Sequence, residues 1–110
     1  MNEKISPYKS LEFLIDNAPK YAEAKANVLY LTEYRKTLKA QLMLSSDAKT
    51  EAGKEAYAYA HSDYMKHLHG FKEAVYRSEC LRWLMVSAQA KIEVWRSLES
   101  SARAEGKSTQ

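Results

Sequence analysis

Residues 50–105 decide the fold and read TEAGKEAYAYAHSDYMKHLHGFKEAVYRSECLRWLMVSAQAKIEVWRSLESSARAE. The stretch has no proline and only two glycines, Gly53 and Gly70. Its apolar and small residues recur at steps of three or four, the stripe of an amphipathic helix. They are Ala60, Tyr64, Leu68, Phe71, Val75, Ser78, Leu81, Met85, Ala88, Ile92, Trp95 and Ala102. Unbroken, such a helix would run ~80 Å at ~1.5 Å per residue, longer than a domain of this size is wide.

The composition predicts an all-α fold and a single domain over residues 1–110. Charged residues make up 28% of the chain and hydrophobic residues 45%, with only three glycines and two prolines, a balance that favours helices over turns. The formal net charge of +3 permits a nucleic acid partner without demanding one. A lone cysteine, Cys80, excludes an internal disulfide framework and favours a reducing cytoplasm. Without a signal-like or membrane-spanning apolar run, we expect a soluble cytoplasmic protein that does not contact the membrane.

Two helices are predicted before this stretch. Ser6 and the proline after it form a helix start, because serine caps a backbone N–H and proline has none to satisfy. A short N-terminal helix is expected over 7–16. It should end near residue 16, because Pro19 disfavours helical geometry at Ala18. A second helix then covers 19–44, where apolar residues repeat in a heptad-like seam.

The third predicted helix is the longest and covers 48–104. Residues 45–47 (Ser-Ser-Asp) break the pattern and offer caps for it. Because this loop is short, the second and third helices should form a long antiparallel hairpin. A kink or restart is expected near 61–62, with Ser62 as an internal cap, and 106–110 should be a loose tail.

The distal part of the third helix is predicted to form an oligomer interface. Its apolar stripe has only the short first helix to cover it, and exposure of so many large side chains is unfavourable. The interface residues are Leu81, Leu84, Met85, Ala88, Ile92 and Trp95. We therefore expect a homo-oligomeric helical bundle. The alternative is a kink near 61–62 or at Gly70 that folds the distal helix back onto its own chain.

No arrangement of side chains predicts an enzyme, a cofactor or a metal site. His67 and His69 are two residues apart, so their imidazoles diverge on a helix and do not form a zinc-binding pair. Cys80 lacks the signature of a nucleophile. Residues 106–108 (Gly-Lys-Ser) lack the upstream glycine, strand and helix of a phosphate-binding loop. We therefore predict a non-enzymatic protein without a small-molecule substrate.

The most basic cluster predicts a nucleic acid contact on the second helix. It consists of Arg35, Lys36 and Lys39, with Tyr34 beside them. Exposed aromatic rings next to cations can stack on the bases of a single strand. The alternative is an ordinary solvated helix face, with Arg35 in an ion pair and tyrosine rings packed with their hydroxyls at the rim.

Two segments of the chain resemble a group of small phage and prophage proteins. One is 90–97 (AKIEVWRS), followed by Ala102 and Arg103, and the other is 51–64 (EAGKEAYAYAHSDY). Members of that group tend to be encoded among recombination and single-strand annealing genes. The resemblance implies a phage origin, a place in the cytoplasm of the bacterial host cell, and a non-enzymatic accessory role in DNA metabolism or in countering the host.

The leading hypothesis is a phage accessory protein in DNA recombination or replication that contacts single-stranded DNA or a DNA-processing protein. The alternative is an interaction protein that inhibits a host enzyme or defence system without binding nucleic acid. Salt dependence separates the two, because phosphate binding releases counterions and weakens steeply as salt rises.

Overall fold

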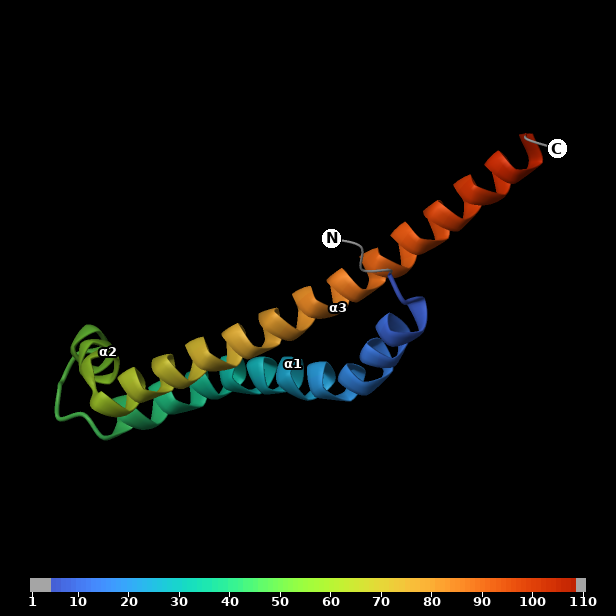
Figure 1. Cartoon of the computed structure of the whole chain (residues 1–110). Coiled ribbons are helices and arrows are strands. Elements are labelled where there is room, and N and C mark those ends of the chain that lie inside the picture. Colours follow the sequence, from blue (N-terminus) through green and yellow to red (C-terminus); the bar gives the residue numbers. More distant parts are fainter. Residues whose placement is uncertain (1–4, 109–110) are drawn as a thin grey trace. The chain divides into compact units, whose positions relative to one another are not determined.

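The structure is a computed structural model that describes residues 5–108, and it is all-α as predicted. Three helices follow one another: α1 (Pro7–Leu44), α2 (Glu51–Ala60) and α3 (Ser62–Ser108), labelled in Figure 1. Within the described residues there is no strand. The positions 1–4 and 109–110, which include part of the predicted C-terminal tail, lie outside the described residues.

The predicted break between 7–16 and 19–44 is absent, because α1 continues through Pro19. The helix starts as expected, with the Ser6 hydroxyl accepting a hydrogen bond from the backbone N–H of Lys9 at 3.3 Å. Proline in a helix interior removes one hydrogen bond and costs ~3 kcal/mol. Asn17 and Tyr21, on either side of the proline, are both half-buried. Burial of one continuous face therefore outweighs the local cost of the proline.

The connection after α1 is capped differently from the prediction. The cap of α2 is Thr50, whose hydroxyl accepts a hydrogen bond from the backbone N–H of Gly53 at 3.0 Å. The serines at 45 and 46 bond within the loop instead: Ser45 donates to the carbonyl of Leu42 and Ser46 accepts from the N–H of Ala48. Consequently the third helix does not begin at residue 48.

The predicted kink near 61–62 is a full break between two helices. His61 ends α2 with extended backbone angles, φ −69° and ψ 142°. Its Nδ1 then accepts a hydrogen bond from the backbone N–H of Asp63 at 3.0 Å. The cap at the start of α3 is therefore His61 and not Ser62, because an imidazole nitrogen can accept from the helix terminus as a hydroxyl does.

The end of α3 also differs from the prediction. The helix continues through Gly106 to Ser108, although glycine commonly ends helices. An isolated glycine costs only ~1 kcal/mol relative to alanine in a helix. The helical turns that precede Gly106 therefore offset this cost, and the helix continues beyond the glycine.

Contacts along the chain divide it into two compact units. Unit 1 contains the described parts of Met1–Tyr21 and Cys80–Gln110, and unit 2 contains Ala22–Glu79. Both α1 and α3 contribute to each unit, so the single domain over 1–110 stays a prediction.

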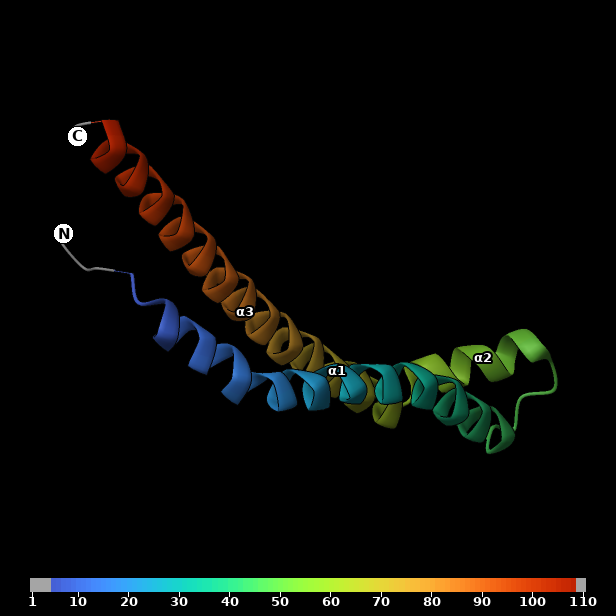
Figure 2. The same cartoon turned by 90° about the vertical axis from the view of Figure 1, so that its right-hand side faces the viewer.

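Unit 2 contains the main core and confirms the antiparallel pairing of the hairpin. Figures 1 and 2 both show the teal part of α1 beside the beginning of α3, with α2 near the end of α1. The core cluster consists of Leu38, Leu42, Ala58 and Tyr64, with Met43 packed against it. All three helices thus supply the core, and burial of each large side chain contributes roughly 1.5–3 kcal/mol.

Unit 1 pairs the first turns of α1 with the distal part of α3. Ser10 and Ala88 are both buried there, and they line the same groove as Phe13. Small residues at a helix contact permit close approach of the backbones, so little apolar area is hidden. The start of α1 therefore covers part of the apolar stripe of distal α3, which includes Ala88.

Replacing the internal proline should stabilise the protein. In Pro19→Ala the restored N–H can donate to the carbonyl of Ile15, and we expect the free energy of unfolding to rise by about 1–2 kcal/mol after allowing for the more flexible unfolded chain. Urea denaturation followed by circular dichroism measures this. The control is Pro7→Ala, which should change stability much less because the first helical position needs no N–H. A lower stability of Pro19→Ala would contradict the account of α1.

Candidate functional site

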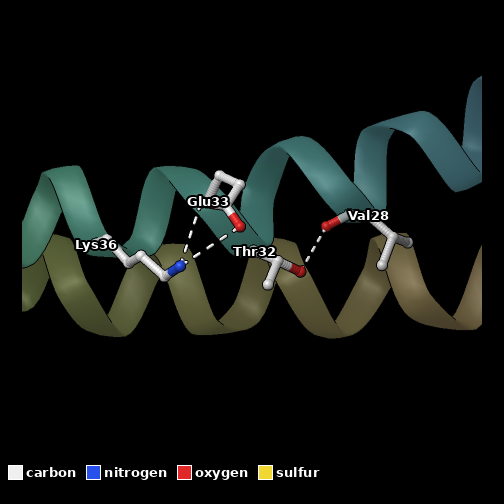
Figure 3. A network of polar contacts seen from close by, with 4 residues as sticks. All are labelled: Val28, Thr32, Glu33 and Lys36. Carbon is white, nitrogen blue, oxygen red and sulfur yellow. Dashed lines mark hydrogen bonds and ion pairs between the residues drawn. The ribbon is translucent and has the colours of Figure 1, made fainter.

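The predicted basic cluster lies on one side of α1, but both of its lysines are paired with acids. Lys36 binds Glu33 one turn earlier on α1, with Nζ 3.3 Å from Oε2, as Figure 3 shows. Lys39 instead contacts α2: its Nζ lies 3.2 Å from Oε1 of Glu55 and 5.0 Å from the ring centre of Tyr59. Both lysines are thus neutralised by a neighbouring carboxylate, which weakens them as phosphate ligands.

The other two predicted residues differ in their surroundings. Arg35 is exposed, and in the described part of the chain no hydrogen bond or ion pair is recorded for it. Tyr34 lies beside α3, where its ring centre is 5.7 Å from that of His67. Tyr34 also stacks on Tyr30, with ring centres 6.1 Å apart and planes 13° apart. The structure therefore groups Tyr34 with aromatic residues and not with the basic cluster.

These tyrosines form one wall of an open groove between α1 and α3 in unit 2. One part of the groove has a volume of about 450 Å³ and is lined by Tyr30, Leu31, Tyr34, Leu38, Asp63, Lys66, His67 and Gly70. A second part, of about 330 Å³, is lined by Glu23, Ala24, Ala26, Asn27, Tyr30, Ala74 and Arg77. The two parts adjoin at Tyr30, which lines both, and together we call them the tyrosine groove.

Helical spacing explains why these side chains line one groove. On α1 the residues 27, 30 and 34 are three or four apart and share one face, as do 66, 70, 74 and 77 on α3. Each face flanks the buried seam between the helices. At Gly70 an added Cβ would meet nothing within 4 Å, so the groove is open at this point.

His67 holds the two walls of the groove together. Its Nε2 lies 3.0 Å from the carbonyl oxygen of Leu31, and because a carbonyl only accepts, Nε2 carries the proton. Its ring also stacks on Phe71, with ring centres 6.3 Å apart. The other nitrogen, Nδ1, is buried without a hydrogen-bond partner. This unpartnered nitrogen costs free energy, which the contact between α1 and α3 must offset.

The charges along the tyrosine groove are balanced. Lys66 and Arg77 are exposed cations in its lining, and Asp63 and Glu23 are acids in the same lining. In the part of the chain that the structure describes, no three His, Cys, Asp or Glu side chains are placed to hold a metal ion. The groove therefore offers flat aromatic surface flanked by single charges, which suits binding of a planar group.

Sequence reasoning missed Tyr30, Lys66 and Arg77. The i, i+4 spacing of Tyr30 and Tyr34 was visible in the sequence, and it places two rings side by side on a helix. Lys66 and Arg77 are far from them in sequence. Only the register of α3 on α1 brings these cations to the same groove.

The predicted oligomer interface is partly covered within unit 1. Ala88 is only 5% exposed, and Leu81, Met85, Ile92 and Trp95 are half-buried. Leu84 remains 54% exposed. Other large apolar side chains of unit 1 are exposed as well, namely Tyr8, Leu11, Ile15, Trp83, Val86, Val94 and Leu98. The predicted interface stays a prediction, and the exposed apolar surface extends beyond it.

Comparison of the chain with protein-family models, with curated proteins and with solved structures found no match. No helix within residues 5–108 combines the length and the apolar character needed to cross a membrane. The arguments for function therefore rest on the residues of this chain.

The contact of Lys39 with α2 should depend on pH. The side chain of Tyr59, and then the carboxylate of Glu55, raise the pKa of Lys39 above its ordinary value of 10.5. Because the folded pKa is the higher one, this stabilisation is fully present below pH 10.5 and is lost as the pH rises through the folded pKa. We expect Lys39→Met to lower the melting temperature at neutral pH and to have no effect at strongly alkaline pH.

Thermal melting followed by circular dichroism over this pH range provides the measurement. The control is Lys25→Met, since Lys25 is exposed and no ion pair is recorded for it among residues 5–108. Its melting temperature should stay near that of the parent protein at every pH. If the melting temperature of Lys39→Met stays below that of the parent protein at strongly alkaline pH, the charge of Lys39 is not what stabilises its contact with α2, and the account is wrong.

Proposed function

We propose that this chain is a non-enzymatic accessory protein of phage origin that holds single-stranded DNA during recombination or replication. The observation that carries the proposal is the stacked pair Tyr30 and Tyr34, which lies in an open groove with Lys66 and Arg77 in its lining. The resemblance of 51–64 and 90–97 to phage proteins encoded among single-strand annealing genes supports the same role. The protein works in the cytoplasm of the bacterial host and needs no cofactor.

Aromatic stacking supplies most of the expected affinity. Each base stacked on an aromatic ring contributes ~1–3 kcal/mol and depends little on sequence. Tyr30 is 64% exposed, so a base can reach its ring. Since the acids Asp63 and Glu23 offset the two cations of the groove, phosphate attraction adds little. Binding should therefore be modest and should vary only shallowly with salt.

Single strands are favoured over duplexes for a geometric reason. The bases of a duplex stack on each other inside the helix, so their faces cannot reach Tyr30 and Tyr34. The tyrosine groove lies between two helices packed side by side and presents no single helix end suited to a major groove.

Substitution of the tyrosines tests the proposal directly. Tyr30→Ala and Tyr34→Ala should each weaken binding of a labelled single strand by about 10-fold or more, as expected for losing one stacked base. Lys66→Ala should weaken binding. It should also reduce the slope of the logarithm of the binding constant against the logarithm of the salt concentration by about 1, as expected for the loss of one phosphate contact. Fluorescence anisotropy with single and double strands at low salt gives these affinities.

Two matched controls separate the groove from the rest of the surface. Lys36→Ala removes a lysine already paired with Glu33, and Tyr76→Ala removes an exposed tyrosine that does not line the tyrosine groove. Both should bind as the parent protein does. If the Tyr30 and Tyr34 variants also bind like the parent, or if no strand binds at micromolar protein, the proposal is wrong.

Self-association into a helical bundle is the second part of the proposal. It is supported by the exposed apolar side chains of unit 1, because a monomer would leave them in water. The expected partners are therefore a second copy and single-stranded DNA, or a recombination or replication protein bound to that DNA. Neither a membrane nor a small-molecule substrate is required.

The same exposed residues favour one alternative, an interaction protein that inhibits a host enzyme or defence system. Tyr8, Trp83 and Leu98 of unit 1 are 76%, 58% and 60% exposed, respectively. Large aromatic and aliphatic side chains of this kind are typical anchors of protein interfaces. The groove variants distinguish the candidates, because Tyr30→Ala and Tyr34→Ala should weaken DNA binding but leave an interface built on Tyr8, Trp83 and Leu98 unchanged.

A further inference from the structure

Unit 1 contains a second groove, distinct from the tyrosine groove and suited to a different kind of ligand. It has a volume of about 230 Å³, with Phe13, Leu84 and Ala88 as its apolar part and Lys9 and Lys91 as its charged part. No acidic residue is among the described residues that line it. We call it the lysine groove. Its chemistry suits an aliphatic side chain flanked by carboxylates.

The size of the lysine groove favours a side chain over a nucleotide. A cavity of about 150 Å³ is enough to hold benzene, so a groove of this volume takes one or two aliphatic groups. Small-molecule pockets are usually larger, at roughly 300–1,000 Å³. Since Ser10 and Ala88 in the lining are buried, the lining is set by the packing of α1 on α3.

The outer face of α1 in the same unit carries the complementary chemistry. Leu11 and Ile15 are one turn apart and are 50% and 63% exposed. Glu12 and Asp16 lie beside them, are exposed, and have no ion pair recorded in the described part of the chain. This acidic apolar face comprises Leu11, Glu12, Ile15 and Asp16, and it would otherwise leave two aliphatic side chains in water.

We propose that the acidic apolar face of one copy docks into the lysine groove of a second copy. Leu11 and Ile15 contact Leu84 of the other copy, and Glu12 and Asp16 lie near its Lys9 and Lys91. Every chain carries both surfaces, so a two-fold axis satisfies two faces and two grooves at once. This inference rests on the self-association proposed above and names the surfaces that perform it.

Charge complementarity within one sequence selects a second copy as the occupant. The charged side-chain groups of both lysines of the groove and of both acids of the face have no ion pair within residues 5–108. Opposite charges at the rim of an interface align the partners and speed association. A docked copy also buries Leu84, the most exposed of the six residues predicted for the interface.

A pair of charge-swapped variants provides the test. One variant is Lys9→Glu with Lys91→Glu, and the other is Glu12→Lys with Asp16→Lys. In each variant alone, like charges face each other across the interface, and we expect the dimer dissociation constant to rise at least about 10-fold. In an equal mixture every contact pairs opposite charges, so a mixed dimer should form with an affinity near that of the parent.

Sedimentation equilibrium gives the masses, and circular dichroism shows that each variant keeps its helices. The control is Lys25→Glu, an exposed charge reversal outside both surfaces, which should remain a dimer. Parent protein that sediments as a 12.6 kDa monomer would overturn the inference, as would swapped variants that dimerise alone or fail to pair when mixed. A parent dimer that ignores single-stranded DNA would overturn the DNA-binding proposal and leave this inference standing.

Discussion

Close antiparallel contact between α1 and α3 is the constraint on which the other features depend. In unit 2 this contact uses the buried residues Ala24, Ala74 and Ser78, and in unit 1 it uses Ser10 and Ala88. Small side chains let the helix backbones approach, but they hide little apolar area. Leu38, Leu42 and Tyr64 are buried in the core of unit 2. Other large side chains, such as Tyr30, Tyr34 and Leu84, line grooves or remain exposed.

The tyrosine groove depends on this contact. Tyr30 and Tyr34 flank the seam of unit 2 and stack on each other, while His67 bridges to the carbonyl of Leu31 beneath them. Because His67 fixes α3 against α1 at this level, the cations of α3 are held at the same groove as the tyrosines. The proposed binding of a single strand thus depends on helix register as much as on residue type.

The sequence predicted the fold class and the pairing of the long helices, because a periodic apolar stripe reports which face of a helix is buried. It did not predict the passage of α1 through Pro19, since local propensity is outweighed by packing on both sides of the proline. The caps at Thr50 and His61 were missed because several polar residues in each loop compete for that role. Helical spacing places Arg35, Lys36 and Lys39 on one side of α1, but it does not reveal that Glu33 and Glu55 engage the two lysines.

The most direct test of the central claim is to locate the contact between a base and the protein. Single-stranded DNA that carries halogenated uracil can be cross-linked by ultraviolet light to the aromatic ring on which the base stacks, and mass spectrometry identifies the attached peptide. Cleavage after Lys25 and Arg35 releases residues 26–35 (ANVLYLTEYR), which contain both Tyr30 and Tyr34. The account predicts that the DNA is attached to this peptide through Tyr30. Attachment confined to tyrosines outside the groove, such as Tyr8 or Tyr57, or no attachment at all, would contradict it.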